Sequence, residues 1–212
     1  MIKHYEGELG VFDYDDEEFE IVEYIIYRFF KFENHEYFHY IGKGLSVNLP
    51  EGCINTSCMF MDCILPNGFH LGDKFDTSNI KNMAFMFNKC IIPDGFTLGD
   101  KFDTSNVVNM ASMFYGCKLP EGFTLGHNFN TSNVEVISWI FSFCKFPKGF
   151  SLGDKFDTSN AKIMSCMFAN SELPESFSLG NKFYISNAID KSFIFKDIQF
   201  HESVSLKITT NK

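Results

Sequence analysis

The sequence has no apolar run that approaches the ~20 residues needed to cross a membrane. The N-terminus, MIKHYEGELGVFDYDDEEFE, lacks the basic stretch followed by an apolar stretch that defines a secretory signal peptide. The C-terminus, VSLKITTNK, shows neither an anchor helix nor a cell-wall sorting pattern. Seven cysteines without a secretion signal favour free thiols in a reducing compartment, so we expect a cytoplasmic protein.

Basic residues are also scarce: 18 Lys and Arg stand against 27 Asp and Glu, a formal net charge of −9. Residues 1–48 carry most of this imbalance, with 11 acidic and 4 basic side chains. The chain therefore offers no basic surface for direct nucleic-acid binding.

Glycine-rich phosphate-binding motifs are missing too, and one catalytic pattern remains. The stretch HEYFHYIG matches H-E-x-x-H through His35, Glu36 and His39. A zinc protease needs both histidines one turn apart on a helix. The aromatic density here predicts a strand, where positions i and i+4 lie ~13 Å apart. We therefore expect no enzyme, no metal and no cofactor, and keep a zinc metalloprotease only as a third alternative.

Proline occurs six times, always at one position of a repeated unit. The unit is 27 residues long, and IPDGFTLGDKFDTSNVVNMASMFYGCK (92–118) is a typical copy. Further copies cover 65–91, 119–145 and 146–172, a degenerate copy covers 173–198, and a truncated copy covers 49–64. Self-similarity at this period predicts stacked supersecondary units.

Each copy carries one strand signal and one helix signal. In GFTL, Phe96 and Leu98 flank Thr97, the alternation of a short strand. In VVNMASMFYGC, apolar residues recur at helical spacing after the cap-forming residues Thr104, Ser105 and Asn106. The sequence predicts an α/β repeat: a right-handed, leucine-rich-repeat-like solenoid with a parallel β-sheet and short helices.

Several positions recur as ladders through the copies. Three ladders of phenylalanine are predicted to stack in the core, represented in one copy by Phe96, Phe102 and Phe114. A cysteine ladder that includes Cys117 is expected to face the core as a small hydrophobic residue and not to bind metal. Asn106 and its equivalents are expected to satisfy backbone groups where each unit turns. The repeated aspartates are interpreted as turn or cap residues.

The pattern TSNVxxMxxMFxxC, with an LP start, resembles the leucine-rich repeats of bacterial BspA-like proteins, here enriched in phenylalanine. The resemblance covers residues 49–198. It implies a solenoid that binds proteins, often as a surface adhesin.

The flanking segments are interpreted as caps on the exposed ends of the solenoid. Residues 1–48 are an acidic, β-rich N-terminal cap, and residues 199–212 are a C-terminal β cap. The aromatics of HEYFHYIG are expected to cover the exposed phenylalanine ladders.

Copies differ most on the face opposite the core, where a binding surface can vary freely. Trp139, the only tryptophan, and Phe143 are predicted to form an outward aromatic patch, with Tyr115, Val108 and Glu135 beside it. The alternative is that Trp139 packs beneath a cap or fills a gap. We expect a non-catalytic module that binds a protein partner through this outer surface. A second alternative is an inhibitor that occupies a basic nucleic-acid-binding protein, as phage counter-defence proteins do, through the acidic segment Asp13, Asp15, Asp16, Glu17 and Glu18.

Overall fold

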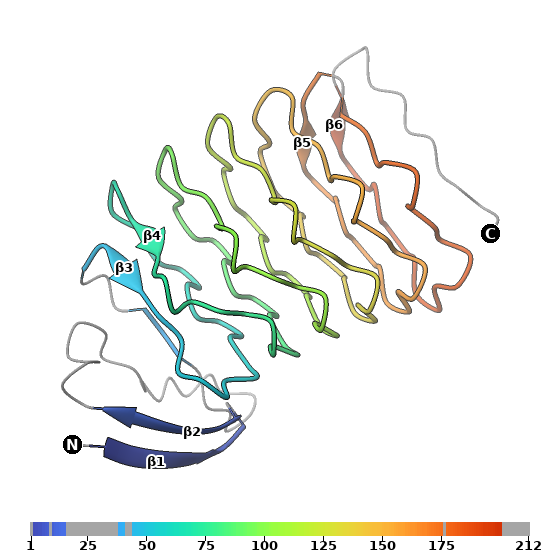
Figure 1. Cartoon of the computed structure of the whole chain (residues 1–212). Helices are drawn as coiled ribbons and strands as arrows, with labels where there is room; N and C mark the ends of the chain where they lie inside the picture. Colours follow the sequence, from blue (N-terminus) through green and yellow to red (C-terminus); the bar gives the residue numbers. More distant parts are fainter. Residues whose placement is uncertain (1, 9, 16–37, 41–43, 176, 201–212) are drawn as a thin grey trace.

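The computed structural model describes residues 2–8, 10–15, 38–40, 44–175 and 177–200. Successive 27-residue segments run alongside one another and form a row of stacked turns (Figure 1). Parallel bridges connect equivalent positions of neighbouring segments: Asn55↔Asn82, Asn82↔Asn109, Asn109↔Val136, Val136↔Ile163 and Ile163↔Asp190. The repeat of the sequence is therefore a repeat of backbone pairing.

The regular strands are short. β1 (Ile2–Gly7) and β2 (Gly10–Asp15) form an antiparallel hairpin. β3 (Ser46–Val47) pairs in parallel with β4 (His70–Leu71), and β5 (Glu172–Leu173) pairs in parallel with β6 (Gln199–Phe200). β6 lies 27 residues after β5, so the repeat register extends to residue 200.

The predicted strand at GFTL is present only as an alternation of burial. Phe96 and Leu98 are buried and Thr97 is exposed, as expected. Among the described residues, only the copy at His70–Leu71 forms a strand ladder at this position. The continuous series of bridges lies elsewhere in the unit, at Asn109 and its equivalents, and further bridges join Lys118 to Lys145 and Lys145 to Glu172.

The segments expected to be short helices are runs of turns, and the described residues contain no helix. Backbone N–H groups there donate to the next segment: Phe85 to Ala111, Phe87 to Met113 and Lys89 to Tyr115, at 2.7–2.8 Å. A helix would use these donors within its own turns. Intervening bonds, such as Met86 N–H to the Met83 carbonyl, close single turns and place residues three or four apart on one side. A spacing of three or four residues is close to the period of an α-helix, which explains why the sequence shows a helical pattern here.

The three phenylalanine ladders are confirmed as the core. The first contains Phe60, Phe87, Phe114, Phe141, Phe168 and Phe195, whose ring centroids stack 5.0–5.7 Å apart with interplanar angles of 1–17°. Phe69 stacks on Phe96 at 6.2 Å in the second ladder, and Phe75 stacks on Phe102 at 6.5 Å in the third. Burial of these rings stabilises each segment only when its neighbours are in place.

Side-chain ladders satisfy the turns, as the sequence predicted. Asn106, Asn133, Asn160 and Asn187 donate to the carbonyls of Ser78, Ser105, Ser132 and Ser159 of the preceding segment. The Asp103 carboxylate accepts the Ser105 N–H at 2.8 Å, and Asp76 and Asp157 do the same in their own segments. The repeated aspartates are turn residues.

The first segment is closed by residues that precede it. Tyr40 is buried, its ring lies 5.9 Å from Phe60 and 5.0 Å from Phe69, and its N–H donates to the Met59 carbonyl. Phe38 is also buried. The expected aromatic lid over the ladders is therefore confirmed for Phe38 and Tyr40. The expected strand pair within residues 199–212 lies, beyond Phe200, outside the described residues.

Candidate functional site: an outward aromatic patch

Each segment contains one run of turns, at residues 84–89, 111–116, 138–143 and 165–170, and we call this element the turn run. Tyr115, Trp139 and Phe143 lie together on the outer side of the turn runs, and we call them the aromatic patch. The Tyr115 ring centroid is 6.2 Å from that of Trp139 and 5.4 Å from that of Phe143. Trp139 is 39% exposed and Phe143 is 48% exposed, while Tyr115 is partly buried between them. The structure therefore brings together the three aromatic residues that the sequence nominated, and Trp139 is not covered by another segment.

Trp139 and Phe143 share an unusual backbone conformation. Trp139 and Phe143 have φ angles of 60° and 57°, in the left-handed region that disfavours most side chains. Every repeat places two residues in this conformation, four positions apart. The outer row contains Cys58, Phe85, Ser112, Trp139, Cys166 and Phe193, and the second row contains Asp62, Lys89, Gly116, Phe143, Asn170 and Asp197.

Aromatic residues in these positions are unusual on physical grounds. The left-handed conformation suits glycine best and asparagine or aspartate next, and costs other L-residues roughly 1–2 kcal/mol. The second row follows this preference at Gly116, Asn170 and Asp197. Trp139 and Phe143 do not, although both are substantially exposed. The backbone at Trp139 and Phe143 therefore carries a cost that glycine would avoid.

Val108, which is exposed, and Glu135, which is partly buried, occupy equivalent positions of neighbouring segments. The Glu135 N–H donates to the Val108 carbonyl at 2.9 Å, so the two positions are adjacent rungs. Val108 is 40% exposed, and the Glu135 carboxylate forms an ion pair with Lys162 at 2.9 Å. The structure thus shows an exposed apolar side chain at Val108 and a neutralised charge at Glu135.

The acidic segment is described only in part. Asp13 lies on β2, is exposed, and pairs with His4 across the hairpin at 2.7 Å. Asp15 ends β2. Asp16, Glu17 and Glu18 lie outside the described residues.

The H-E-x-x-H motif is likewise described only at its last residue. His39 Nε2 lies 3.1 Å from the carbonyl oxygen of Met61. A carbonyl oxygen only accepts, so Nε2 carries the proton and donates, which leaves this nitrogen without a lone pair for a metal. His35 and Glu36, and with them the expected separation of the two histidines, lie outside the described residues. Within the described residues, no group of three or more His, Cys, Asp or Glu side chains could hold a metal ion.

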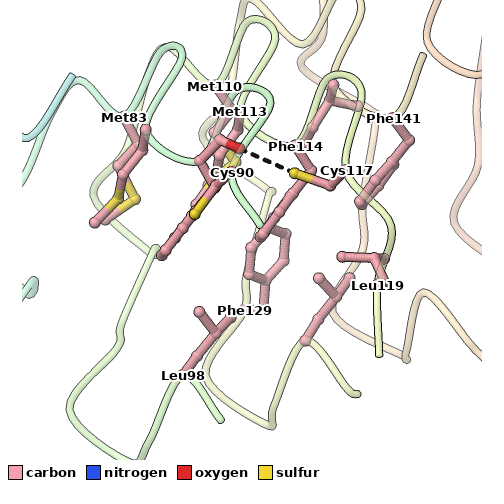
Figure 2. Close-up of a cluster of buried hydrophobic side chains, with 14 of the residues drawn as sticks. Met83, Cys90, Leu98, Met110, Met113, Phe114, Cys117, Leu119, Phe129 and Phe141 are labelled. Carbon is pink, nitrogen blue, oxygen red and sulfur yellow. Dashed lines mark hydrogen bonds between the residues drawn. The ribbon is translucent and has the colours of Figure 1, made fainter. Parts of the chain in front are cut away.

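All seven cysteines are free and buried. Burial raises the pKa of the Cys117 thiol to about 12, so the thiolate is not formed at neutral pH. The Cys117 thiol donates to the Phe87 carbonyl at 2.9 Å, within a cluster of Met, Leu and Phe side chains (Figure 2). The cysteine ladder is buried in the core, as the sequence predicted.

The shared repeat position of the residues in each row follows from the 27-residue period, whereas their left-handed backbone conformation was not predicted from the sequence. Phe85 and Phe193 belong to the same outer row as Trp139 and are 41% and 61% exposed. The sequence did carry a signal of the left-handed conformation in the second row, where Gly116 and Asn170 alternate with larger residues at one repeat position.

The described part of the chain has no helix capable of spanning a membrane. No curated protein matches the chain. No solved structure matches it either. A family model described as "Mycoplasma protein of unknown function, DUF285" matches residues 54–176 and again residues 98–206, which together span more than half of the chain. The chain therefore belongs to this family of repeat proteins.

Proposed function

We propose that the protein is a non-catalytic, protein-binding module that acts through its outer surface. In this proposal the stacked segments are a right-handed solenoid of the kind that the BspA-like resemblance implies. The 27-residue register of parallel bridges supports that architecture. Solenoids present extended surfaces on which one protein can contact many positions of another.

The observation that carries the proposal is the aromatic patch. Trp139 and Phe143 are exposed in a backbone conformation that penalises them, whereas Gly116 and Asn170 fill the positions equivalent to Phe143 at a smaller cost. Exposed tryptophan and tyrosine side chains are the residues most enriched at the energetic centres of protein interfaces. Their rings are tilted by 53–56° to Tyr115, so they form no flat platform for a planar ligand.

The test compares protein capture from lysate of the native host by three forms of the chain. Trp139→Asn with Phe143→Asn removes the aromatic rings and keeps side chains that tolerate the left-handed backbone. Ile91→Asn is the matched control, because Ile91 is 59% exposed but lies outside both left-handed rows. We expect wild type and the control to retain a protein that the double variant loses, with binding at least tenfold weaker in the double variant.

Equal capture by all three forms would contradict the proposal. Salt dependence separates the patch from the acidic segment 13–18, because screening weakens binding between exposed charges far more than an apolar contact. Loss of binding between low and high salt, with no effect of the double variant, would favour the inhibitor hypothesis instead.

A further inference from the structure

Asn67 is the only asparagine of the chain that is followed by glycine. It stands at the start of its repeat copy, at the position that Asp94, Glu121 and Lys148 occupy in the next three copies. In an Asn-Gly pair the backbone nitrogen of the glycine can attack the side-chain carbonyl carbon of the asparagine, because the glycine has no side chain to obstruct the approach. Of these four positions, only Asn67 carries a side-chain amide.

The pair forms the centre of an exposed turn. The Phe69 N–H donates to the Pro66 carbonyl at 3.0 Å, Asn67 has a negative φ, and Gly68 has a φ of 79°. These features define a type II turn with Asn67 and Gly68 as its two central residues. Both residues are exposed, and a Cβ at Gly68 would meet no other atom within 4 Å. Water therefore has free access to the pair.

The reacting groups are not held by other interactions. Among the described residues, the Gly68 N–H donates to no acceptor and the Asn67 side chain forms no hydrogen bond. The hydrogen bond of the turn joins its flanking residues, so the peptide between the two central residues can rotate while that bond remains. Glycine tolerates the backbone angles that this rotation produces. The Gly68 nitrogen can thus approach Asn67 Cγ without loss of the bond between Phe69 and Pro66.

Asparagines elsewhere in the repeat are held more firmly. Asn106 and Asn133 donate to backbone carbonyls of the preceding segment, and each is followed by valine, whose branched side chain crowds the backbone nitrogen. Asn170 precedes Ser171, whose N–H donates to the Phe168 carbonyl at 3.2 Å. Exposure, a free N–H and a following glycine therefore coincide at Asn67.

We propose that Asn67 is a site of spontaneous deamidation in the folded protein. The Gly68 nitrogen bonds to Asn67 Cγ and loses its proton, the bond from Cγ to the side-chain nitrogen breaks, and that nitrogen leaves as ammonia. Water then opens the resulting succinimide ring at one of its two carbonyls and gives aspartate or isoaspartate. Either product adds one negative charge to the formal net charge of −9. This inference goes beyond the proposed protein-binding function and does not depend on it.

The two products differ in their effect on the fold. Aspartate leaves the backbone unchanged, and Asp94 already occupies the equivalent turn, in which the Phe96 N–H donates to the Pro93 carbonyl. Isoaspartate routes the backbone through the side chain and lengthens the turn by one carbon atom. Phe69 follows the turn directly, and its ring lies 5.0 Å from that of Tyr40. Because the core is closely packed, the isoaspartate form disturbs the contact between the first segment and its aromatic lid.

The test is peptide mapping by mass spectrometry after incubation of the full chain in heavy-oxygen water at neutral and mildly alkaline pH. The peptide that contains Asn67 should incorporate one heavy oxygen atom and separate into two products, of which one is a substrate of protein isoaspartate methyltransferase. We expect conversion at least tenfold faster than at Asn106 or Asn170. The rate should rise with pH, because the attacking nitrogen must lose its proton.

Asn67→Gln is the matched control, since it keeps the amide but requires a larger ring for the same attack. Its peptide should remain unchanged over the same period. If Asn67 stays intact in the folded chain but reacts in the urea-unfolded chain, the turn protects it and the proposal is overturned. Equal rates at Asn67 and Asn106 in the folded chain would overturn it as well.

Urea unfolding measures the consequence for the fold. Asn67→Asp should unfold at the same urea concentration as wild type, because only an exposed charge changes. The fraction of aged protein that is rich in isoaspartate should unfold at a lower urea concentration. Equal midpoints for the three forms would contradict the disturbance of the lid.

Discussion

Cys117 shows how one side chain can serve two needs of a repeat. Its thiol fills core volume and donates to the Phe87 carbonyl of the preceding segment. Ser171 occupies the equivalent position in a later segment and donates to the Phe141 carbonyl at 2.6 Å. The inward direction of this ladder followed from the repeat position alone. The hydrogen bond could not be predicted, because it depends on the offset between stacked segments.

Burial of Cys117 predicts a loss of stability in alkaline solution. Its pKa is raised from an ordinary value of about 9 to about 12, so between these pH values the unfolded chain releases a proton that the folded chain retains. Stabilisation from this thiol is complete below about pH 9 and is lost as pH rises toward 12, by about 1.4 kcal/mol per pH unit.

Urea unfolding of wild type and Cys117→Ser at pH 9.0, 9.5 and 10.0 measures this contribution. The variant should show a shallower decline of unfolding free energy, because lysines, tyrosines and the other thiols titrate alike in both proteins. Parallel declines would show that the Cys117 thiol ionises in the folded chain.

The turn run is the element in which the described residues differ from the short helices that the sequence predicted. Apolar residues at 107, 110, 114 and 117 match a helix and equally match successive turns that return to the core every three or four residues. The deciding feature is the destination of the backbone N–H groups, which bond to the next segment. A pattern within one copy cannot report that destination.

Substitution of Gly116 distinguishes the two structures by the sign of its effect. In a helix interior, Gly→Ala stabilises by about 1 kcal/mol. Gly116 has a φ of 69°, and a Cβ there would lie 3.2 Å from Lys89 Cγ. We therefore expect Gly116→Ala to destabilise the protein by about 1–2 kcal/mol in chemical denaturation.

Asn170→Gly, at the equivalent position two segments later, is the control and should change stability by only a few tenths of a kcal/mol. An increase in stability for Gly116→Ala would indicate that the run is helical after all.

At the scale of the molecule, the 27-residue period predicted most of the core. Phe96, Phe102 and Phe114 were assigned to three stacked ladders from their repeat positions, and all three are buried. The same period could not identify a partner, because packing constrains the shared positions and leaves the outward ones unspecified. Trp139 was recognised only as a departure from its equivalents.

Deletion of one complete unit tests whether the molecule is held together by nearest-neighbour contacts. Removal of residues 92–118 keeps every following residue in its repeat position, so we expect a folded protein that is less stable by about 1–4 kcal/mol. Removal of residues 92–117 shifts every later ladder by one position and should abolish cooperative unfolding. Circular dichroism and urea denaturation of the two deletions provide the comparison. Similar stability of both would contradict a register-dependent core.

The direction of the hydrogen bonds in the turn run gives the molecule a polarity. Each segment sends its N–H groups forward, so its first segment presents carbonyl oxygens, which the Tyr40 N–H and His39 Nε2 meet. In the last described segment, residues 191, 193, 195 and 197 occupy the donor positions, with no further segment among the described residues to accept from them. The two ends therefore require opposite closures, donors at one and acceptors at the other. A symmetric contact between two such last segments would oppose donor to donor, so an end-to-end contact between two copies would have to pair a last segment with a first segment.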